Sequence, residues 1–169
     1  MAINPLDTLD ASLASQVGEL LRARQMKLAT AESCTGGLLG DLITSVPGSS
    51  DYYVGGVIAY AYQAKTALLD IPQKFLLQYG AVSQETARAM ARGVRERLNA
   101  DIAVSLTGIL GPGGGMPNKP VGLVFIALLA PGLDRCEHFI WNETRRQNKL
   151  ASANAALTLL LDYLGGLAS

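Results

Sequence analysis

Cysteine and histidine are scarce in this chain of 169 residues, which has two cysteines and a single histidine. Cys34 and Cys136 lie in different predicted elements, and two isolated cysteines of this kind favour free thiols over a structural disulfide. His138 lies in a predicted strand, without nearby cysteines or clustered carboxylates. The sequence therefore contains no recognisable set of metal ligands and no usable histidine base.

An excess of charge is also absent, because 14 basic residues balance 14 acidic ones and neither sign forms a long run. This balance argues against nucleic acid or an anionic membrane as a partner and favours small-molecule substrates. No apolar run approaches the length of a membrane span, and no basic segment followed by an apolar one marks the N-terminus. We therefore expect a cytoplasmic protein that has neither a nucleic-acid nor a membrane partner.

What the chain has in quantity is hydrophobic residues, at 49% of the sequence, which suffices for the core of one domain over residues 1–169. Their spacing alternates between the periods of helices and strands. This alternation predicts an α/β fold, a three-layer α/β/α sandwich whose mixed, mostly parallel sheet ends in a C-terminal hairpin turning at Pro131-Gly132. Helices are expected over 9–25, 38–46, 63–69, 84–98 and 144–164, with a further turn through Leu77, and strands over 27–32, 53–60, 101–106, 121–130 and 135–141. Ser83 is expected to start the helix 84–98, and the glycines within 53–60 are expected to mark a bulge or a close backbone approach.

The stretch Ala31-Glu32-Ser33-Cys34-Thr35-Gly36-Gly37 joins the first predicted strand to a helix. Its hydroxyls and thiol are thus expected at a helix N-terminus, where unpaired amides and a partial positive charge can hold an anion or an oxyanion. An N-cap role for Ser33 or Thr35 explains the same residues without chemistry.

A serine nucleophile without a histidine can use a lysine whose pKa is lowered by burial. Lys65 is the candidate for such a base, with Tyr60 and Tyr62 close to it in sequence. The alternatives are that Lys65 is a solvated helix residue and that the tyrosines only pack. The pair alone identifies no enzyme family, because such spacings vary freely between folds.

The loop Gly111-Pro112-Gly113-Gly114-Gly115, with Lys119 after it, could wrap a phosphate with its amides. It is not a Walker A motif, because the Gly-Lys-Ser/Thr ending is missing and a strand follows. An exposed loop before a hairpin is the alternative. Loops that leave strand ends in an α/β sheet converge on a crevice, so this loop, the Ser33 turn and the Tyr60–Lys65 segment suggest one site.

Several motifs occur together in a specific order: Ala31 to Gly37, Gly48-Ser49-Ser50, Gly56 to Tyr60 with Lys65, Gly80 to Ser83, and Thr107 to Gly122. In order and spacing they resemble the CinA C-terminal domain family, whose active members are nicotinamide-nucleotide amidohydrolases. The resemblance spans most of the chain, from the first predicted helix to the last.

The resemblance implies hydrolysis of the carboxamide of nicotinamide mononucleotide to nicotinic acid mononucleotide and ammonia, a step of pyridine nucleotide salvage, without metal or cofactor. It implies Ser33 as nucleophile, Lys65 as base and Tyr60 as a helper. It also implies that a homodimer or larger homo-oligomer forms. The expected oxyanion donors and substrate-binding residues are Thr35, Gly36, Gly37, Thr107, Gly108, Gly111, Gly113, Gly114, Lys119 and Arg145.

Three departures from the family pattern leave other readings open: Tyr62, Leu110 and the segment Trp141-Asn142-Glu143. The last replaces the usual Gly-Asp-Arg, so Arg145 or Arg146 would have to supply the arginine that meets a substrate phosphate. One alternative is a catalytically silent relative that binds a nucleotide or a partner. Another makes Cys34 the nucleophile, because helix N-termini lower thiol pKa values.

Overall fold

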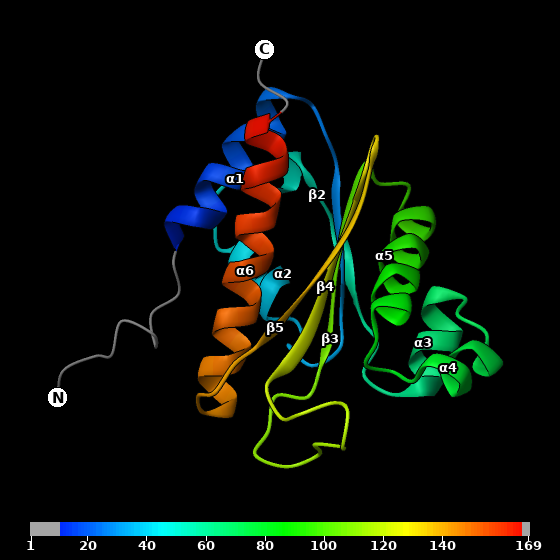
Figure 1. Ribbon diagram of the computed structural model, residues 1–169. Helices are drawn as coiled ribbons and strands as arrows, with labels where there is room; N and C mark the ends of the chain where they lie inside the picture. The colour runs from blue at the N-terminus through cyan, green and yellow to red at the C-terminus, as the bar shows by residue number, and fades with distance from the viewer. Residues whose placement is uncertain (1–10, 167–169) are drawn as a thin grey trace, which may run out of the picture.

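The computed structural model describes residues 11–166, in which helices and strands alternate as the sequence predicts (Figure 1). Leu9 and Asp10, at the start of the first predicted helix, lie outside the described residues. The elements are α1 (Ala11–Ala23), β1 (Leu28–Glu32), α2 (Leu38–Thr44), the short 3-10 helix η2 (Ser49–Asp51), β2 (Tyr53–Ile58), α3 (Tyr62–Leu69), α4 (Gln73–Tyr79), α5 (Gln84–Leu98), β3 (Ile102–Gly108), β4 (Leu123–Ala130), β5 (Leu133–Ile140) and α6 (Arg145–Gly166).

The five strands form one sheet in the order β2-β1-β3-β4-β5. β1 pairs in parallel with both β2 and β3, whereas β4 runs antiparallel to β3 and to β5. Four strands therefore share one direction and β4 opposes them, which confirms the mixed sheet and its C-terminal hairpin. Because β1, β2 and β3 are parallel, their carboxyl ends meet at one edge of the sheet.

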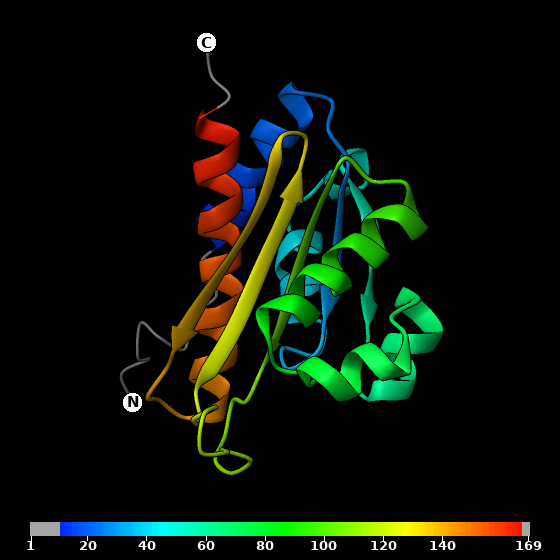
Figure 2. The ribbon, with the colours of Figure 1, turned by 45° about the vertical axis from the view of Figure 1, so that its right-hand side comes forward.

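Helices cover both faces of the sheet, with α1, α2 and α6 on one face and α3, α4 and α5 on the other (Figures 1 and 2). The face under α6 is built from leucine, isoleucine and valine side chains. The opposite face is lined mainly by small side chains, because Ala29, Ala31 and Ala103 face a helix that contributes Ala87 and Ala91. Small side chains on both sides let α5 pack closely, and the Ser105 hydroxyl donates a 2.5 Å hydrogen bond to the Ala87 carbonyl.

Two local predictions are confirmed in detail. The register of β1 against β2 shifts between Leu28 and Ala29, which is the irregularity expected from the glycines of β2. A Cβ on Gly56 would lie 2.4 Å from Thr30 Oγ1 and 2.6 Å from the Tyr53 hydroxyl oxygen, so these two side chains fill the space that a larger residue would need. Ser83 caps α5 by accepting a 3.1 Å hydrogen bond from the Thr86 amide.

Within residues 11–166, no helix is long and apolar enough to cross a membrane. The same residues contain no group of three or more His, Cys, Asp or Glu side chains that could hold a metal ion. His138 occupies a position in β5, where its ring lies 6.0 Å from that of Phe125. The prediction of a simple strand position for the histidine is thus confirmed.

Candidate active site

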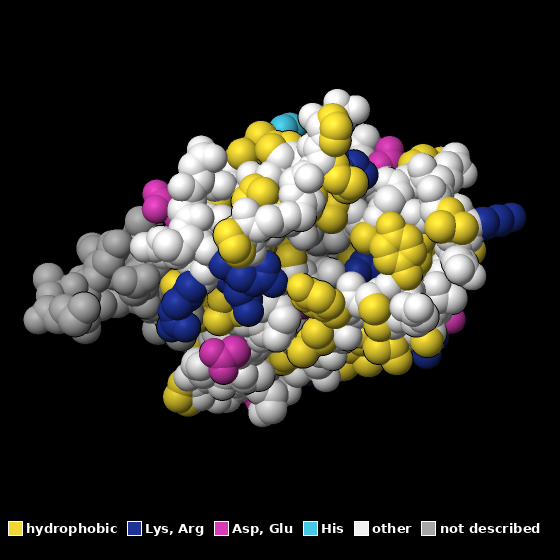
Figure 3. All heavy atoms as spheres, turned by 90° about the horizontal axis from the view of Figure 1, so that it is seen from below, with side chains coloured by type: hydrophobic (Ala, Val, Ile, Leu, Met, Phe, Trp, Pro, Cys, Tyr) yellow, Lys and Arg dark blue, Asp and Glu magenta, His cyan; other side chains and the backbone are white. Residues whose placement is uncertain are grey.

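A cavity of about 270 Å³ opens at the carboxyl ends of β1 and β3. Figure 3 views this end of the molecule, where lysine and arginine side chains cluster on the side of α6. Seven predicted site residues line the cavity: Ser33, Tyr60, Thr107, Gly108, Gly113, Gly114 and Arg145. A larger cavity of about 480 Å³, between the end of α5 and the final hairpin, contains no serine, cysteine or lysine in its lining.

Ser33 lines the cavity, and Lys65 lies directly behind it, in contact with its hydroxyl but not in the cavity lining. Ser33 follows β1, and its amide donates a 3.0 Å hydrogen bond to the Leu106 carbonyl, which continues the pairing of β1 with β3. Lys65 lies in the first turn of α3, where side chains point back toward the helix N-terminus. Its Nζ lies 3.0 Å from Ser33 Oγ, so residues 32 positions apart are brought together.

The Lys65 side chain is fully buried, at 0% exposure. Burial lowers the pKa of its amine from 10.5 to about 8, because the charged form loses its hydration. The Nζ also contacts the carbonyl oxygens of Ala59 at 2.7 Å and Tyr60 at 3.2 Å. A neutral amine has two hydrogens for these carbonyls and one lone pair for the Ser33 hydroxyl, so the arrangement suits a general base. The reading of Lys65 as a solvated residue is therefore wrong.

Tyr60 contacts Lys65 through its backbone and not through its ring. The side chain is 63% exposed, and its hydroxyl accepts a 3.2 Å hydrogen bond from Arg145 Nη2. Tyr60 thus contacts the Lys65 amine through its carbonyl and Arg145, in the cavity lining, through its hydroxyl. Any positioning of Lys65 by this residue, as expected from the sequence, comes from its carbonyl.

The cap of α2 differs from the one predicted. Neither Ser33 nor Thr35 caps the helix, because the buried carboxylate of Glu32 accepts hydrogen bonds from the amides of Gly37, Leu39 and Gly40. The helix N-terminus that the sequence predicts as a place for an anion thus holds the Glu32 side chain, because three amides at its start are bound to this carboxylate.

This cap changes the set of oxyanion donors expected from the sequence. The Gly37 amide is bound to Glu32, the Gly36 amide donates to the Ser33 carbonyl at 3.2 Å, and the Thr35 hydroxyl donates to Glu32 at 2.6 Å. Gly36 and Gly37 serve the turn instead through positive φ angles of 65° and 100°, which side chains disfavour. Within residues 11–166, the amides of Cys34 and Thr35 donate to no backbone carbonyl, which leaves these two as the candidate donors.

The glycine loop reaches the cavity only in part. Gly113 and Gly114 line it, while the carbonyl of Gly111 accepts a 2.7 Å hydrogen bond from Arg145 Nη1. Lys119 does not line the cavity, because its Nζ turns away toward the Tyr79 carbonyl at 3.3 Å. The expectation that Lys119 lies in the pocket is thus wrong, and Arg145 is the cation present there.

The three departures lie in different surroundings: Leu110 lines the cavity as well as packing in the core, Trp141 packs against that core, and Tyr62 is 38% exposed. The Leu110 side chain is 2% exposed and joins the core beneath α6. Trp141 stacks on Phe139 and donates from its indole to Ser152 at 2.9 Å. The Tyr62 hydroxyl accepts a 3.2 Å hydrogen bond from the Ala81 amide. None of these side chains displaces Ser33 or Lys65, and Arg145, the first residue of α6, lines the cavity.

Cys34 lines the cavity but is poorly suited to act as a nucleophile. Burial raises the pKa of its thiol to about 12, and the Glu32 carboxylate raises it further, so the thiol is protonated at neutral pH.

Sequence reasoning missed Ala81, Val82 and Ile109 in the cavity wall, because apolar residues carry no chemical signal. The capping role of Glu32 was also missed, because its carboxylate accepts from amides that lie five to eight residues later in the chain. This separation is larger than in the usual capping motifs.

Comparison with known proteins gives consistent matches. A "CinA-like protein" of Desulfotalea psychrophila is 48% identical over 148 residues, which cover 88% of this chain and 36% of the relative. One from Synechococcus sp. (strain RCC307) is 53% identical over 129 residues, covering 76% of this chain and 30% of the relative. The chain thus spans about a third of the length of these curated relatives.

Solved structures show the same fold. The competence/damage inducible protein CihA from Agrobacterium tumefaciens is 36% identical with a TM-score of 0.86, covering 98% of this chain and 99% of that one. A CinA superfamily protein from Escherichia coli is 32% identical with a TM-score of 0.88, covering 96% of this chain and 94% of that one. The CinA C-terminal domain matches residues 10–164. On these matches, the chain belongs to the CinA C-terminal domain family.

Proposed function

We propose that the protein is a serine-lysine amidohydrolase that hydrolyses the carboxamide of nicotinamide mononucleotide. The observation that carries the proposal is the 3.0 Å contact between a buried lysine amine and a serine hydroxyl in a cavity wall. A buried amine with a pKa of about 8 is partly neutral at physiological pH and can take the serine proton. The family resemblance supplies the substrate.

The reaction runs through an acyl-enzyme. Lys65 takes the proton of Ser33 as Ser33 Oγ attacks the carboxamide carbon, and the developing oxyanion lies near the amides of Cys34 and Thr35. The C–N bond breaks and ammonia leaves with the proton held by Lys65. Water then loses a proton to Lys65 and attacks the ester, which releases nicotinic acid mononucleotide and restores both side chains.

The cavity also suits a phosphate-bearing substrate. Arg145 lines it together with Gly113 and Gly114, and its guanidinium group is held by the Gly111 carbonyl and the Tyr60 hydroxyl. A guanidinium pairs with a phosphate through two parallel hydrogen bonds, and glycine lets the backbone come close to a ligand. We assign the phosphate to this side of the cavity and the carboxamide to the Ser33 side.

The direct test is to incubate the purified protein with nicotinamide mononucleotide and follow ammonia and nicotinic acid mononucleotide in equal amounts. Equal release of the two products supports the proposal. No release at any pH between 6 and 10, together with saturable binding of the nucleotide, would instead favour a catalytically silent binding module. The predicted homo-oligomer stays a prediction that sedimentation equilibrium can test.

The pH dependence should report Lys65. We expect kcat/KM to rise with pH and level off above a midpoint near pH 8, because only the neutral amine accepts the serine proton and its pKa is about 8. Initial rates between pH 6 and 10 measure the curve. A rate that is flat through this range would remove Lys65 from the role of base.

Arg145 should govern nucleotide affinity more than turnover. Replacing Arg145 by methionine is expected to raise KM for the nucleotide about tenfold, the effect of losing roughly 1.4 kcal/mol of phosphate binding. The measurement compares nicotinamide mononucleotide with the nucleoside that lacks its phosphate. The wild type should prefer the nucleotide and Arg145→Met should show little preference, while the exposed neighbour Arg146→Met should behave as wild type. Equal selectivity in wild type and Arg145→Met would place the phosphate elsewhere.

A further inference from the structure

Glu32 is the buried charged side chain that the reaction scheme does not use. It is the last residue of β1, directly before Ser33, and is 2% exposed. Its carboxylate accepts four hydrogen bonds from the turn and helix that follow: from Thr35 Oγ1 at 2.6 Å, and from the amides of Gly37 at 3.1 Å, Leu39 at 3.1 Å and Gly40 at 2.9 Å. Within residues 11–166, it has no lysine, arginine or histidine as an ion-pair partner.

These four bonds fix the segment that carries the candidate nucleophile. Their donors span residues 35–40, so one carboxylate ties both the turn and the first turn of α2 to the end of β1. Within residues 11–166 the other hydrogen bonds to this turn are few. The Gly36 amide donates to the Ser33 carbonyl, the Asp41 amide donates to the Gly37 carbonyl, and Ser33 itself bonds to Leu106 through its amide and to Lys65 through its hydroxyl. Two glycines with positive φ angles make this stretch intrinsically pliable.

The chemistry of the four donors requires a carboxylate. Oε2 accepts three of the bonds and Oε1 accepts the fourth, and every partner is an N–H or O–H group. A carboxamide of the same size would turn an NH₂ group toward at least one amide N–H, which leaves a donor facing a donor. Glutamine at this position therefore keeps the volume and breaks the bonding.

We propose that Glu32 is a positioning residue for Ser33, holding the turn so that Ser33 Oγ stays within hydrogen-bond distance of Lys65 Nζ. Glu32 does not line the cavity that holds Ser33, so it acts through the turn and not on the substrate. The catalytic part of this inference rests on the proposed function. The claim that Glu32 fixes the position of Ser33 does not depend on the proposed function, and the labelling rate of Ser33 tests it separately.

The experiment compares Glu32→Gln and Glu32→Asp with the wild type. For Glu32→Gln we expect kcat to fall at least tenfold while KM changes less than twofold, and the midpoint near pH 8 should stay because Lys65 is untouched. Glu32→Asp keeps the charge and should recover part of the loss. The second readout is the rate at which an alkyl fluorophosphonate labels Ser33, located by peptide mass spectrometry, and it should fall in parallel with kcat.

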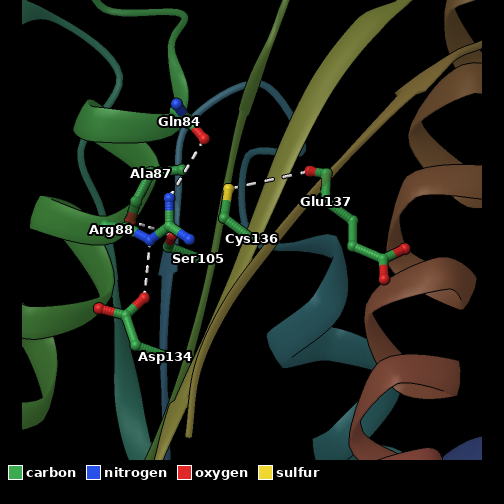
Figure 4. Close-up of polar contacts among 7 residues, drawn as sticks. All are labelled: Gln84, Ala87, Arg88, Ser105, Asp134, Cys136 and Glu137. Carbon is green, nitrogen blue, oxygen red and sulfur yellow. Dashed lines mark hydrogen bonds and ion pairs between the residues drawn. The ribbon is translucent and has the colours of Figure 1, made fainter.

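A matched control separates positioning from a general loss of stability. Ser105 is also fully buried, and its hydroxyl donates to the Ala87 carbonyl on the α5 side of the sheet (Figure 4). Ser105→Ala removes a buried hydrogen bond that does not reach the Ser33 turn. Both Glu32→Gln and Ser105→Ala should lower the thermal midpoint, but only Glu32→Gln should lower kcat and the labelling rate.

The outcomes can be told apart. A folded Glu32→Gln protein that labels at the wild-type rate overturns the positioning role. If Glu32→Gln does not fold, Thr35→Val removes one of the four donors, and an unchanged labelling rate in that variant overturns the role equally. A wild type that labels at Ser33 but leaves nicotinamide mononucleotide intact overturns the proposed substrate alone. A wild type that does neither overturns both proposals.

Discussion

Lys65→Met should reduce turnover by about 10² to 10⁴-fold, the usual contribution of a positioned general base. Methionine keeps a chain of similar length in the buried site but has no lone pair strong enough to take the Ser33 proton. Ammonia release under saturating nucleotide measures the effect. The matched control is Lys74→Met, the same replacement at an exposed lysine of α4, which should leave turnover unchanged.

The same pair of variants should differ in the pH dependence of stability. The pKa of Lys65 is about 8 in the folded protein and near 10.5 when unfolded, so between these values the unfolded chain binds more protons. The free energy of unfolding of the wild type should therefore rise with pH from about 8 to 10.5, by about 3 kcal/mol in total. Lys65→Met should lack this rise.

Denaturant melts at several pH values measure this difference, and subtracting the Lys65→Met curve removes the contribution of other titrating groups. Lys74→Met should keep the full rise of the wild type. A Lys65→Met curve that runs parallel to the wild type would show that the amine is not desolvated in the folded protein, and would remove the physical basis of its activation.

Ser33→Ala should abolish hydrolysis, with a loss of at least about a thousandfold, because the acyl-enzyme can no longer form. The methyl group fits the space of the hydroxymethyl group without strain, so the fold should persist. Steady-state ammonia release and circular dichroism together check both parts. Residual activity above one-tenth of the wild type would exclude Ser33 as nucleophile.

The adjacent thiol provides the control in the same turn. Cys34→Ala should retain turnover within a few-fold, because burial raises the pKa of the Cys34 thiol to about 12 and keeps it protonated. If Cys34→Ala were inactive and Ser33→Ala active, the thiol would be the nucleophile and the assignment would reverse.

The sequence predicts the architecture well because the apolar spacing is regular. The period of α5 and its Ser83 cap, the Pro131-Gly132 hairpin and the glycine irregularity in β2 all follow from local rules and are confirmed. Ser33 and Lys65 could be named from residue chemistry and family resemblance. Their contact could not be derived from spacing, because it depends on how β1 and α3 pack at the sheet edge.

Side-chain direction is where sequence reasoning failed. Lys119 follows a glycine loop that reaches the cavity, yet its amine turns toward the Tyr79 carbonyl, a contact between residues 40 positions apart. The cap by Glu32 likewise depends on a buried carboxylate meeting amides up to eight residues ahead. The direction of the Lys119 amine and the cap by Glu32 both depend on tertiary contacts. Neither can be read from the spacing of residues in the sequence.

The small side chains between α5 and the sheet affect the size of the cavity. Ala81 and Val82 lead into α5 and form one wall of the cavity, and the helix behind them lies as close as Ala31 and Ala87 permit. A bulkier residue in this layer would push the wall outward without altering any group that meets a ligand. The size of ligand that the cavity accepts can therefore change during evolution through one added methyl group in the buried layer.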